Sequence, residues 1–142
     1  MNDHTPAPLI LDTSVLTEVA RGDGDIIGLV QAYDARNRPM VVPALAMVGA
    51  SLDARAEEAA DLLAGLELME SVTVAPLNGV EQSIALADVI SRTGLDPYDA
   101  HVAAIADVAI CPILTLDSAK WSRPSQALDE PLHIIEIRDP EA

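Results

Sequence analysis

The stretch Leu95–Asp117, which reads LDPYDAHVAAIADVAICPILTLD, decides the fold because it joins one helix to one buried strand. The residues DPYD at 96–99 are typical of a helix start, with aspartate as the N-cap and proline in the first turn. Pro112 ends this helix, and the apolar run Ile113–Leu116 is typical of a strand covered on both faces of a parallel sheet. Asp117 follows the run directly, so the stretch predicts an acidic side chain at the carboxyl end of a strand.

A second short apolar run near the N-terminus ends in the same way. Leu9–Leu11 predicts a buried strand, and Asp12 follows it. Ligands of open parallel sheets bind beyond the carboxyl ends of the strands, so Asp12 and Asp117 meet there if the two strands are neighbours. Asp99, in the first turn of the intervening helix, reaches the same crevice. Carboxylates this close need a cation between them, and hard oxygen ligands favour Mg²⁺ or Mn²⁺, so Asp12, Asp99 and Asp117 are the predicted catalytic metal ligands.

Each of these carboxylates also has a purely structural interpretation. Asp12 is a candidate cap for the helix that follows it, and Asp99 a candidate partner of Asp96 in capping its own helix. Asp117 is a candidate cap for the turn that begins at Ser118. Asp96 suits an N-cap better than a contact to metal or water.

Three further side chains near the carboxylates have two interpretations each. Ser14 and Thr115 are expected either to orient the carboxylates by hydrogen bonds or to serve as a helix N-cap and a satisfied strand hydroxyl. His101 lies two residues after Asp99, about 200° around the helix, and therefore faces elsewhere. A surface or partly buried histidine is expected there rather than an acid or base.

Strands and helices alternate along the chain, which predicts an α/β fold with a mostly parallel sheet of about five strands in three layers. The expected strands are 9–11, 40–42, 72–74, 113–116 and 132–137, and the expected helices are 14–21, 25–37, 44–55, 57–70, 80–92 and 96–111, with one helical turn at 118–123. The 80–92 helix is expected to turn Ile84, Leu86, Ala87 and Ile90 mostly inward. A single domain, residues 1–142, is expected, with loose ends at 1–7 and 138–142.

The composition limits the functions that this chain can have. A formal net charge of −15, with eight Lys and Arg, argues against broad electrostatic binding to phosphate. The scarcity of aromatic residues, with no Phe, two Tyr and one Trp, argues against a base-stacking platform. A nucleic-acid enzyme of this charge depends on metal ions and a few local arginines; Arg21 is either one of these or an ordinary solvated side chain. A basic protein partner fits better. The single cysteine, Cys111, the absence of a signal-like start and the short apolar stretch at 40–52 predict a soluble cytoplasmic protein with no membrane association.

Three motifs, PLILDTS at 8–14, DAH at 99–101 and LTLD at 114–117, together resemble the PIN-domain ribonucleases, and most closely the VapC toxins of VapBC toxin–antitoxin pairs. The resemblance covers almost the whole chain and implies a PIN-like fold. It also implies an Mg²⁺- or Mn²⁺-dependent endoribonuclease that hydrolyses RNA phosphodiester bonds and leaves 5′-phosphate and 3′-hydroxyl ends. A VapB-like antitoxin would block the site, and relatives of this kind often form homodimers.

One helix departs from the family pattern. A helix with a Val-Pro-Ala-Leu-like opening usually supplies a glutamate to the metal site, and here the helix that opens at Val42–Leu45 has Gly49 at the matching position, give or take one residue. Asp53, one turn further on the same face, either substitutes in part from a position displaced by about 6 Å or is a solvated surface residue. The site then holds three carboxylates where the family usually has four.

Two functional hypotheses follow. The first is the active metal-dependent ribonuclease, and the second is a degenerate PIN domain that binds a partner or RNA but cleaves slowly or not at all. Gly49 and the net charge of −15 favour the second. A haloacid-dehalogenase-like phosphatase also has an aspartate after its first strand, but that family needs another aspartate two positions later, where this chain has Ser14.

Overall fold

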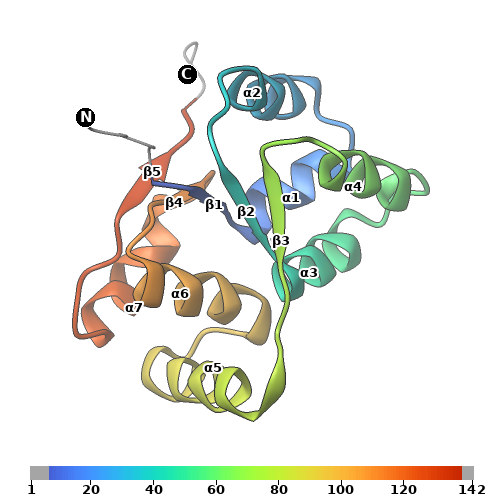
Figure 1. Ribbon diagram of the computed structural model, residues 1–142. Coiled ribbons are helices and arrows are strands. Elements are labelled where there is room, and N and C mark those ends of the chain that lie inside the picture. The colour runs from blue at the N-terminus through green and yellow to red at the C-terminus, as the bar shows by residue number, and fades with distance from the viewer. Residues whose placement is uncertain (1–6, 139–142) are drawn as a thin grey trace.

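The computed structural model describes residues 7–138, and Figure 1 shows its strands and helices. The loose ends expected at 1–7 and 138–142 lie, apart from one residue each, outside this range. The strands are β1 (Leu9–Leu11), β2 (Met40–Pro43), β3 (Val72–Ala75), β4 (Ile113–Thr115) and β5 (Ile134–Glu136). The helices are α1 (Thr13–Ala20), α2 (Gly24–Ala35), α3 (Ala44–Ala54), α4 (Ala59–Glu67), α5 (Gly79–Thr93), α6 (Pro97–Ala109) and α7 (Ser122–Ala127), with a 3₁₀ turn, η1 (Ser118–Trp121), before α7.

All five strands are parallel and form one sheet in the order β3-β2-β1-β4-β5. The predicted α/β class is therefore confirmed, and the predicted neighbours β1 and β4 are hydrogen-bonded to each other. The chain first builds outward from β1 to β2 and β3, then returns to add β4 and β5 on the other side. Right-handed crossovers that run in opposite directions place their helices on opposite faces of the sheet. Figure 1 shows this arrangement, with α1, α2 and α4 on one side of the sheet and α6 on the other, where α5 packs against α6 and α7.

The strand order reverses between β1 and β4, which is the position where open α/β sheets bind their ligands. Ile10 pairs with Ile113 and Leu11 with Leu114, and the amide of Asp12 then donates to the carbonyl of Leu114 at 3.2 Å. Asp12 is therefore level with the end of β4, while Asp117 lies beyond it. The two acidic strand ends are neighbours but are not in register.

The centre of the sheet is apolar on both faces because helices cover both. The exposed fraction of every side chain in β1 is 1% or less, and Ile113 and Leu114 of β4 are equally buried. Burial of a side chain of this kind contributes about 1.5–3 kcal/mol. The paired strands β1 and β4 thus give the switch point a rigid base.

Two predictions about helices need correction. In α5 the side chain of Ile84 is 64% exposed, Ala87 is exposed as well, and Leu86 and Val89 are the buried residues. The predictions for Ile84 and Ala87 were wrong because α5 packs against α6 and α7 and not on the sheet, so a narrower stripe of α5 is covered. The single turn expected at 118–123 is longer, since η1 leads directly into α7. Between residues 7 and 138, the helices are all too short or too polar to cross a membrane.

Candidate active site

Asp12 is the N-cap of α1 and is completely buried. Its Oδ1 accepts a hydrogen bond from the backbone amide of Val15 at 3.1 Å and another from the hydroxyl of Ser14 at 2.6 Å. Its Oδ2 accepts from the indole Nε1 of Trp121 at 3.1 Å and contacts the ammonium of Lys120 at 3.2 Å. A carboxylate offers about four lone-pair positions, so these four donors use the acceptor capacity of Asp12 fully.

Asp99 lies in the first turn of α6, and its backbone amide donates to the N-cap carboxylate of Asp96 at 2.8 Å. The predicted capping role of Asp96 is therefore confirmed. The Asp99 side chain is 16% exposed, and its Oδ1 lies 3.4 Å from the ammonium of Lys120. Burial raises the pKa of the Asp99 carboxyl above its usual value, an effect that the charge of Lys120 opposes and the neighbouring carboxylates of Asp96 and Asp12 reinforce.

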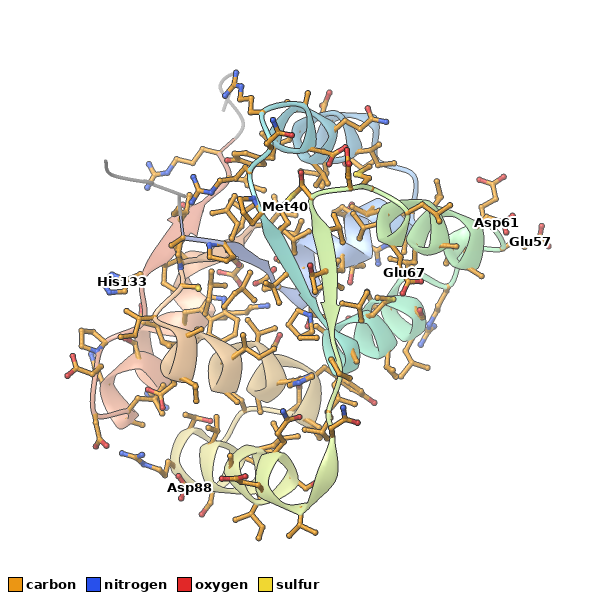
Figure 2. All side chains as sticks on the ribbon, viewed as in Figure 1. Met40, Glu57, Asp61, Glu67, Asp88 and His133 are labelled. Carbon is orange, nitrogen blue, oxygen red and sulfur yellow. The ribbon has the colours of Figure 1, made fainter. Side chains whose placement is uncertain are left out.

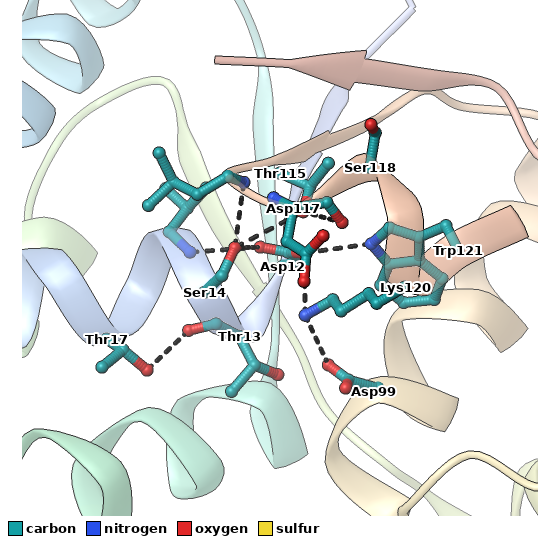
Figure 3. Close-up of polar contacts among 12 residues, drawn as sticks. Asp12, Thr13, Ser14, Thr17, Asp99, Thr115, Asp117, Ser118, Lys120 and Trp121 are labelled. Atoms are coloured by element: carbon teal, nitrogen blue, oxygen red, sulfur yellow. Dashed lines mark hydrogen bonds and ion pairs between the residues drawn. The ribbon is translucent and has the colours of Figure 1, made fainter. Parts of the chain in front are cut away.

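Lys120 is the central cation of this site, and Figure 3 shows its ammonium between the carboxylates of Asp12 and Asp99. The side chain is 24% exposed, and its Nζ lies 5.3 Å from the centre of the Trp121 ring. Burial on its own would lower the pKa of Lys120, but the charges of Asp12 and Asp99 outweigh it, and the pKa is raised. The ammonium therefore stays charged at neutral pH.

Lys120 is also the residue of this candidate site that sequence reasoning missed. It is in η1, three residues after Asp117, and turns of this kind carry no helix or strand periodicity that would assign a direction to its side chain. One signal was available: Lys120 is the single lysine in the sequence, and the other Lys or Arg positions are all arginines.

Asp117 is exposed at the end of β4, and only its backbone is fixed, by the hydroxyl of Thr115, which accepts from the Asp117 amide at 3.0 Å. Its side chain does not cap η1. Ser118 bonds Glu136 instead, through its amide at 3.0 Å and its hydroxyl at 2.7 Å. Asp117 therefore contributes to neither the capping interaction nor the buried cluster around Lys120.

Ser14 connects the two strand ends. Its hydroxyl donates to Asp12 and accepts from the amide of Leu116 at 3.0 Å, and it lies 3.4 Å from the hydroxyl of Thr115. For Ser14 the orienting interpretation holds, because Asp12 is the N-cap of α1 and the Ser14 hydroxyl donates to that carboxylate. For Thr115 the interpretation as a satisfied strand hydroxyl holds, because its hydroxyl accepts from the amide of Asp117.

Thr13 lies beside this cluster. Its hydroxyl is buried, and Figure 3 shows it on the side of Asp99. Burial raises the pKa of the Asp99 carboxyl and hydrogen bonding from this hydroxyl lowers it, so Thr13 belongs to the surroundings of that carboxylate.

The residues present fit a cation only in part. Asp12 and Asp99 already share one, the ammonium of Lys120. In the part of the chain that the structure describes, however, no three His, Cys, Asp or Glu side chains form a group that could hold a metal ion. The three-carboxylate metal site at Asp12, Asp99 and Asp117 therefore stays a prediction.

Gly49 is buried on α3, and the space beside it is filled. A Cβ built on Gly49 would lie 2.8 Å from Cγ and 2.9 Å from Cβ of Tyr98, and 3.2 Å from a methyl of Thr13. These neighbours adjoin Asp99 and Asp12 in the chain, so position 49 faces the predicted site. The Tyr98 side chain occupies the volume in which an acidic side chain at position 49 would begin.

Asp53 and His101 both lie away from the carboxylate pair. Asp53 is exposed, and its carbonyl accepts from the guanidinium of Arg21 at 3.1 Å. His101 is 3% exposed, so the expectation of a surface or partly buried histidine was wrong. Its Nδ1 accepts from the amide of Leu45 at 3.2 Å, at the start of α3, and burial lowers its pKa.

An open groove of about 620 Å³ begins at Ser14 and is called here the Arg21–Arg55 groove. It is lined by Ser14, Thr17, Glu18, Arg21, Asp53, Arg55 and Leu116. Arg21 is held by Glu18 at 2.8 Å, and Arg55 ends α3 in a left-handed conformation, with φ of 49°. Two of the eight Lys and Arg in this acidic chain therefore face one groove beside the buried carboxylates.

Similar folds occur in solved structures of three other proteins. A chain of the VapBC2 complex from Rickettsia felis, solved with a DNA fragment from its promoter, superposes with a TM-score of 0.62 and 12% identity over 90% of this chain and 97% of that one. A chain of DNA-bound VapBC from Salmonella typhimurium superposes with a TM-score of 0.59 and 16% identity over 92% of this chain and 98% of that one. PAE2754 from Pyrobaculum aerophilum superposes with a TM-score of 0.54 and 15% identity over 89% of this chain and 83% of that one. Similarity at these identities establishes the fold alone.

No curated protein sequence matches the chain. The family model of the PIN domain, however, matches residues 9–125, from β1 into α7. The matched region includes the carboxylates of Asp12 and Asp99, and it also includes Asp117 and Lys120. Since the match covers well over half of the sequence, the chain belongs to the PIN domain family.

Proposed function

We propose that this PIN domain is a divalent-metal-dependent endoribonuclease and the toxin of a toxin–antitoxin pair. The observation that carries the proposal is the pair Asp12 and Asp99, which lie on either side of one cation at the switch point of the sheet. PIN-domain membership supports nuclease chemistry at this pair. The proposed metal is Mg²⁺ or Mn²⁺, and Asp117 is the proposed third ligand.

In this proposal Asp12 and Asp99, with Asp117 as the third ligand, would hold the metal, which would supply Lewis-acid chemistry for hydrolysis of the phosphodiester. The chain's own residues hold the ligands in place. Ser14 and the amide of Val15 fix one oxygen of Asp12, and Trp121 fixes the other, so this carboxylate cannot rotate. The start of α6, fixed by the Asp96 cap, sets the position of Asp99.

The Arg21–Arg55 groove is the proposed path of the RNA backbone. It begins at Ser14, whose hydroxyl bonds Asp12, so a strand lying in it would bring a phosphate to the carboxylates. Phosphate contacts from a few arginines suit a chain whose net charge of −15 opposes broader attraction to RNA. Glu18 and Asp53 also line the groove and limit this attraction.

A basic, VapB-like antitoxin is the proposed protein partner. Two of the similar solved structures are VapBC complexes, which supports a partner of this kind. The acidic surface fits a basic protein by charge. We further propose that the chain acts in the cytoplasm and forms a homodimer.

The second candidate function is a binding module without cleavage. Two observations favour it: Tyr98 fills the space beside Gly49, and Lys120 occupies the position between the two buried carboxylates. In this case the domain would bind RNA or an antitoxin, and its cation would be the lysine.

Cleavage of labelled RNA by purified protein distinguishes the two functions. We expect cleavage with Mn²⁺, none with chelator, and none for Asp99→Asn, since a neutral amide replaces a charged ligand. Asp107→Asn, an exposed position two turns further along α6, is the matched control and should cleave like wild type. Absence of cleavage in every metal, with RNA or antitoxin binding retained, would support the binding module.

A further inference from the structure

Lys120 is the only lysine in the sequence, and it lies in the position where the proposed function needs a metal ion. We propose that Lys120 is a built-in cation that occupies the divalent-metal position of the metal-free protein and must leave before Mg²⁺ or Mn²⁺ binds. The proposal rests on the proposed function only in so far as Asp12 and Asp99 form a metal site.

The bonding of Asp12 identifies Lys120 as its exchangeable partner. Of its four donors, the amide of Val15 belongs to the helix backbone, and the indole of Trp121 is completely buried. Ser14 is held from its other side by the amide of Leu116. Lys120 alone is a long side chain with solvent access, so its departure requires no change of backbone.

The charges require a cation in the metal-free state. Asp12 is completely buried, the side chain of Asp99 is 16% exposed, and both contact the same ammonium. Without a counter-ion these two carboxylates would repel each other, and the buried Asp12 would also lose its hydration, a combination that proteins seldom tolerate. A lysine at this position removes that cost, and a divalent ion, with twice the charge, competes with it for the same oxygens.

The filled space beside Gly49 supports the same conclusion. A fourth carboxylate at that position would attract a divalent ion strongly, but Tyr98 excludes it. Without that carboxylate, Asp12 and Asp99 alone attract the divalent ion, and the tethered ammonium of Lys120 already occupies both. A divalent ion therefore gains less over the lysine here than it would in a site with more carboxylates.

Calorimetric titration with Mn²⁺ tests the competition. Lys120→Met keeps most of the side-chain length and removes the charge, so we expect Mn²⁺ to bind about tenfold more tightly than to wild type, equivalent to about 1.4 kcal/mol. Lys120→Arg keeps the charge and is the matched control, with an affinity close to wild type. Equal affinity of Lys120→Met and wild type, or binding by neither, would overturn the proposal.

Chemical labelling of the unmodified protein gives an independent test that needs no variant. An amine-specific reagent has one side-chain target, Lys120, and the α-amino group serves as internal reference. We expect Mn²⁺ to increase the labelling of Lys120, measured by mass spectrometry of its peptide, because the released ammonium becomes exposed. Unchanged or reduced labelling at Mn²⁺ concentrations that saturate the protein would overturn the proposal.

These tests separate this proposal from the proposed function. Tighter Mn²⁺ binding by Lys120→Met in a protein that cleaves no RNA would support the built-in cation and reject the nuclease. Mn²⁺-dependent cleavage by wild type, with equal Mn²⁺ affinity in Lys120→Met, would support the nuclease and reject the built-in cation.

Discussion

The ends of β1 and β4 look alike in sequence and differ in structure. Each apolar strand is followed by an aspartate, but Asp12 is completely buried with four donors, whereas Asp117 is exposed and only its backbone is bonded. Figure 2 shows the wider contrast, with acidic side chains such as Glu57, Asp61 and Asp88 at the periphery. The difference shows that the donors around a carboxylate, and not its place at a strand end, decide whether it becomes part of a buried site.

The strongest way to break this comparison is to remove each carboxylate. Asp12→Ala leaves the indole of Trp121 unpaired beside a buried cavity and Lys120 with Asp99 as its remaining partner, and loss of one partner of a buried ion pair costs about 3–5 kcal/mol. Urea denaturation should show a loss of this size in the free energy of unfolding. A loss below about 1 kcal/mol would mean that the cluster rearranges freely.

The next test adds volume beside the buried carboxylates. Gly49→Ala places a methyl against Tyr98 and Thr13, and overpacking of this kind costs about 1–3 kcal/mol, against a gain in helix propensity of up to about 1 kcal/mol. Thermal melting should show net destabilisation, which Tyr98→Ala in the same chain should largely remove. Additive losses in the double variant would show that Tyr98 is not the obstacle.

A third test concerns His101, a buried polar group on the same helix as Asp99. Its folded-state pKa lies below the unfolded value of about 6.5, so the unfolded chain takes up the proton first as the pH falls. The stability contributed by neutral His101 should be present above about pH 6.5 and be lost progressively as the pH falls below that value. Melting of wild type and His101→Gln across this range measures the effect, and parallel pH profiles would contradict it.

The smallest expected effect is at Asp117. Asp117→Asn removes an exposed charge whose side chain caps nothing, so the free energy of unfolding should change by less than about 0.5 kcal/mol. Urea denaturation beside Asp12→Ala sharpens the comparison directly. A loss approaching that of Asp12→Ala would show that Asp117 joins the buried cluster in solution.

The sequence predicted the architecture because its signals were local. The apolar runs at 9–11 and 113–116, each followed by aspartate, were sufficient to pair β1 with β4 and to bring Asp12 and Asp99 together. The position of Ile84 was not predictable, because the stripe of α5 that is buried depends on its packing against α6 and α7. Lys120 was missed for a similar reason: the direction of a side chain in a turn follows from tertiary contacts and not from periodicity.

The hydrogen bond from Trp121 to Asp12 has an optical consequence. Trp121 is the only tryptophan in the sequence, and its indole touches the carboxylate that holds the Lys120 ammonium, itself 5.3 Å from the ring. Indole emission depends on nearby charge and on the strength of the N–H bond, so replacement of the ammonium by another cation would alter the fluorescence. The chain thus contains a built-in spectroscopic reporter, through which the occupancy of its site can be followed in real time and without a label.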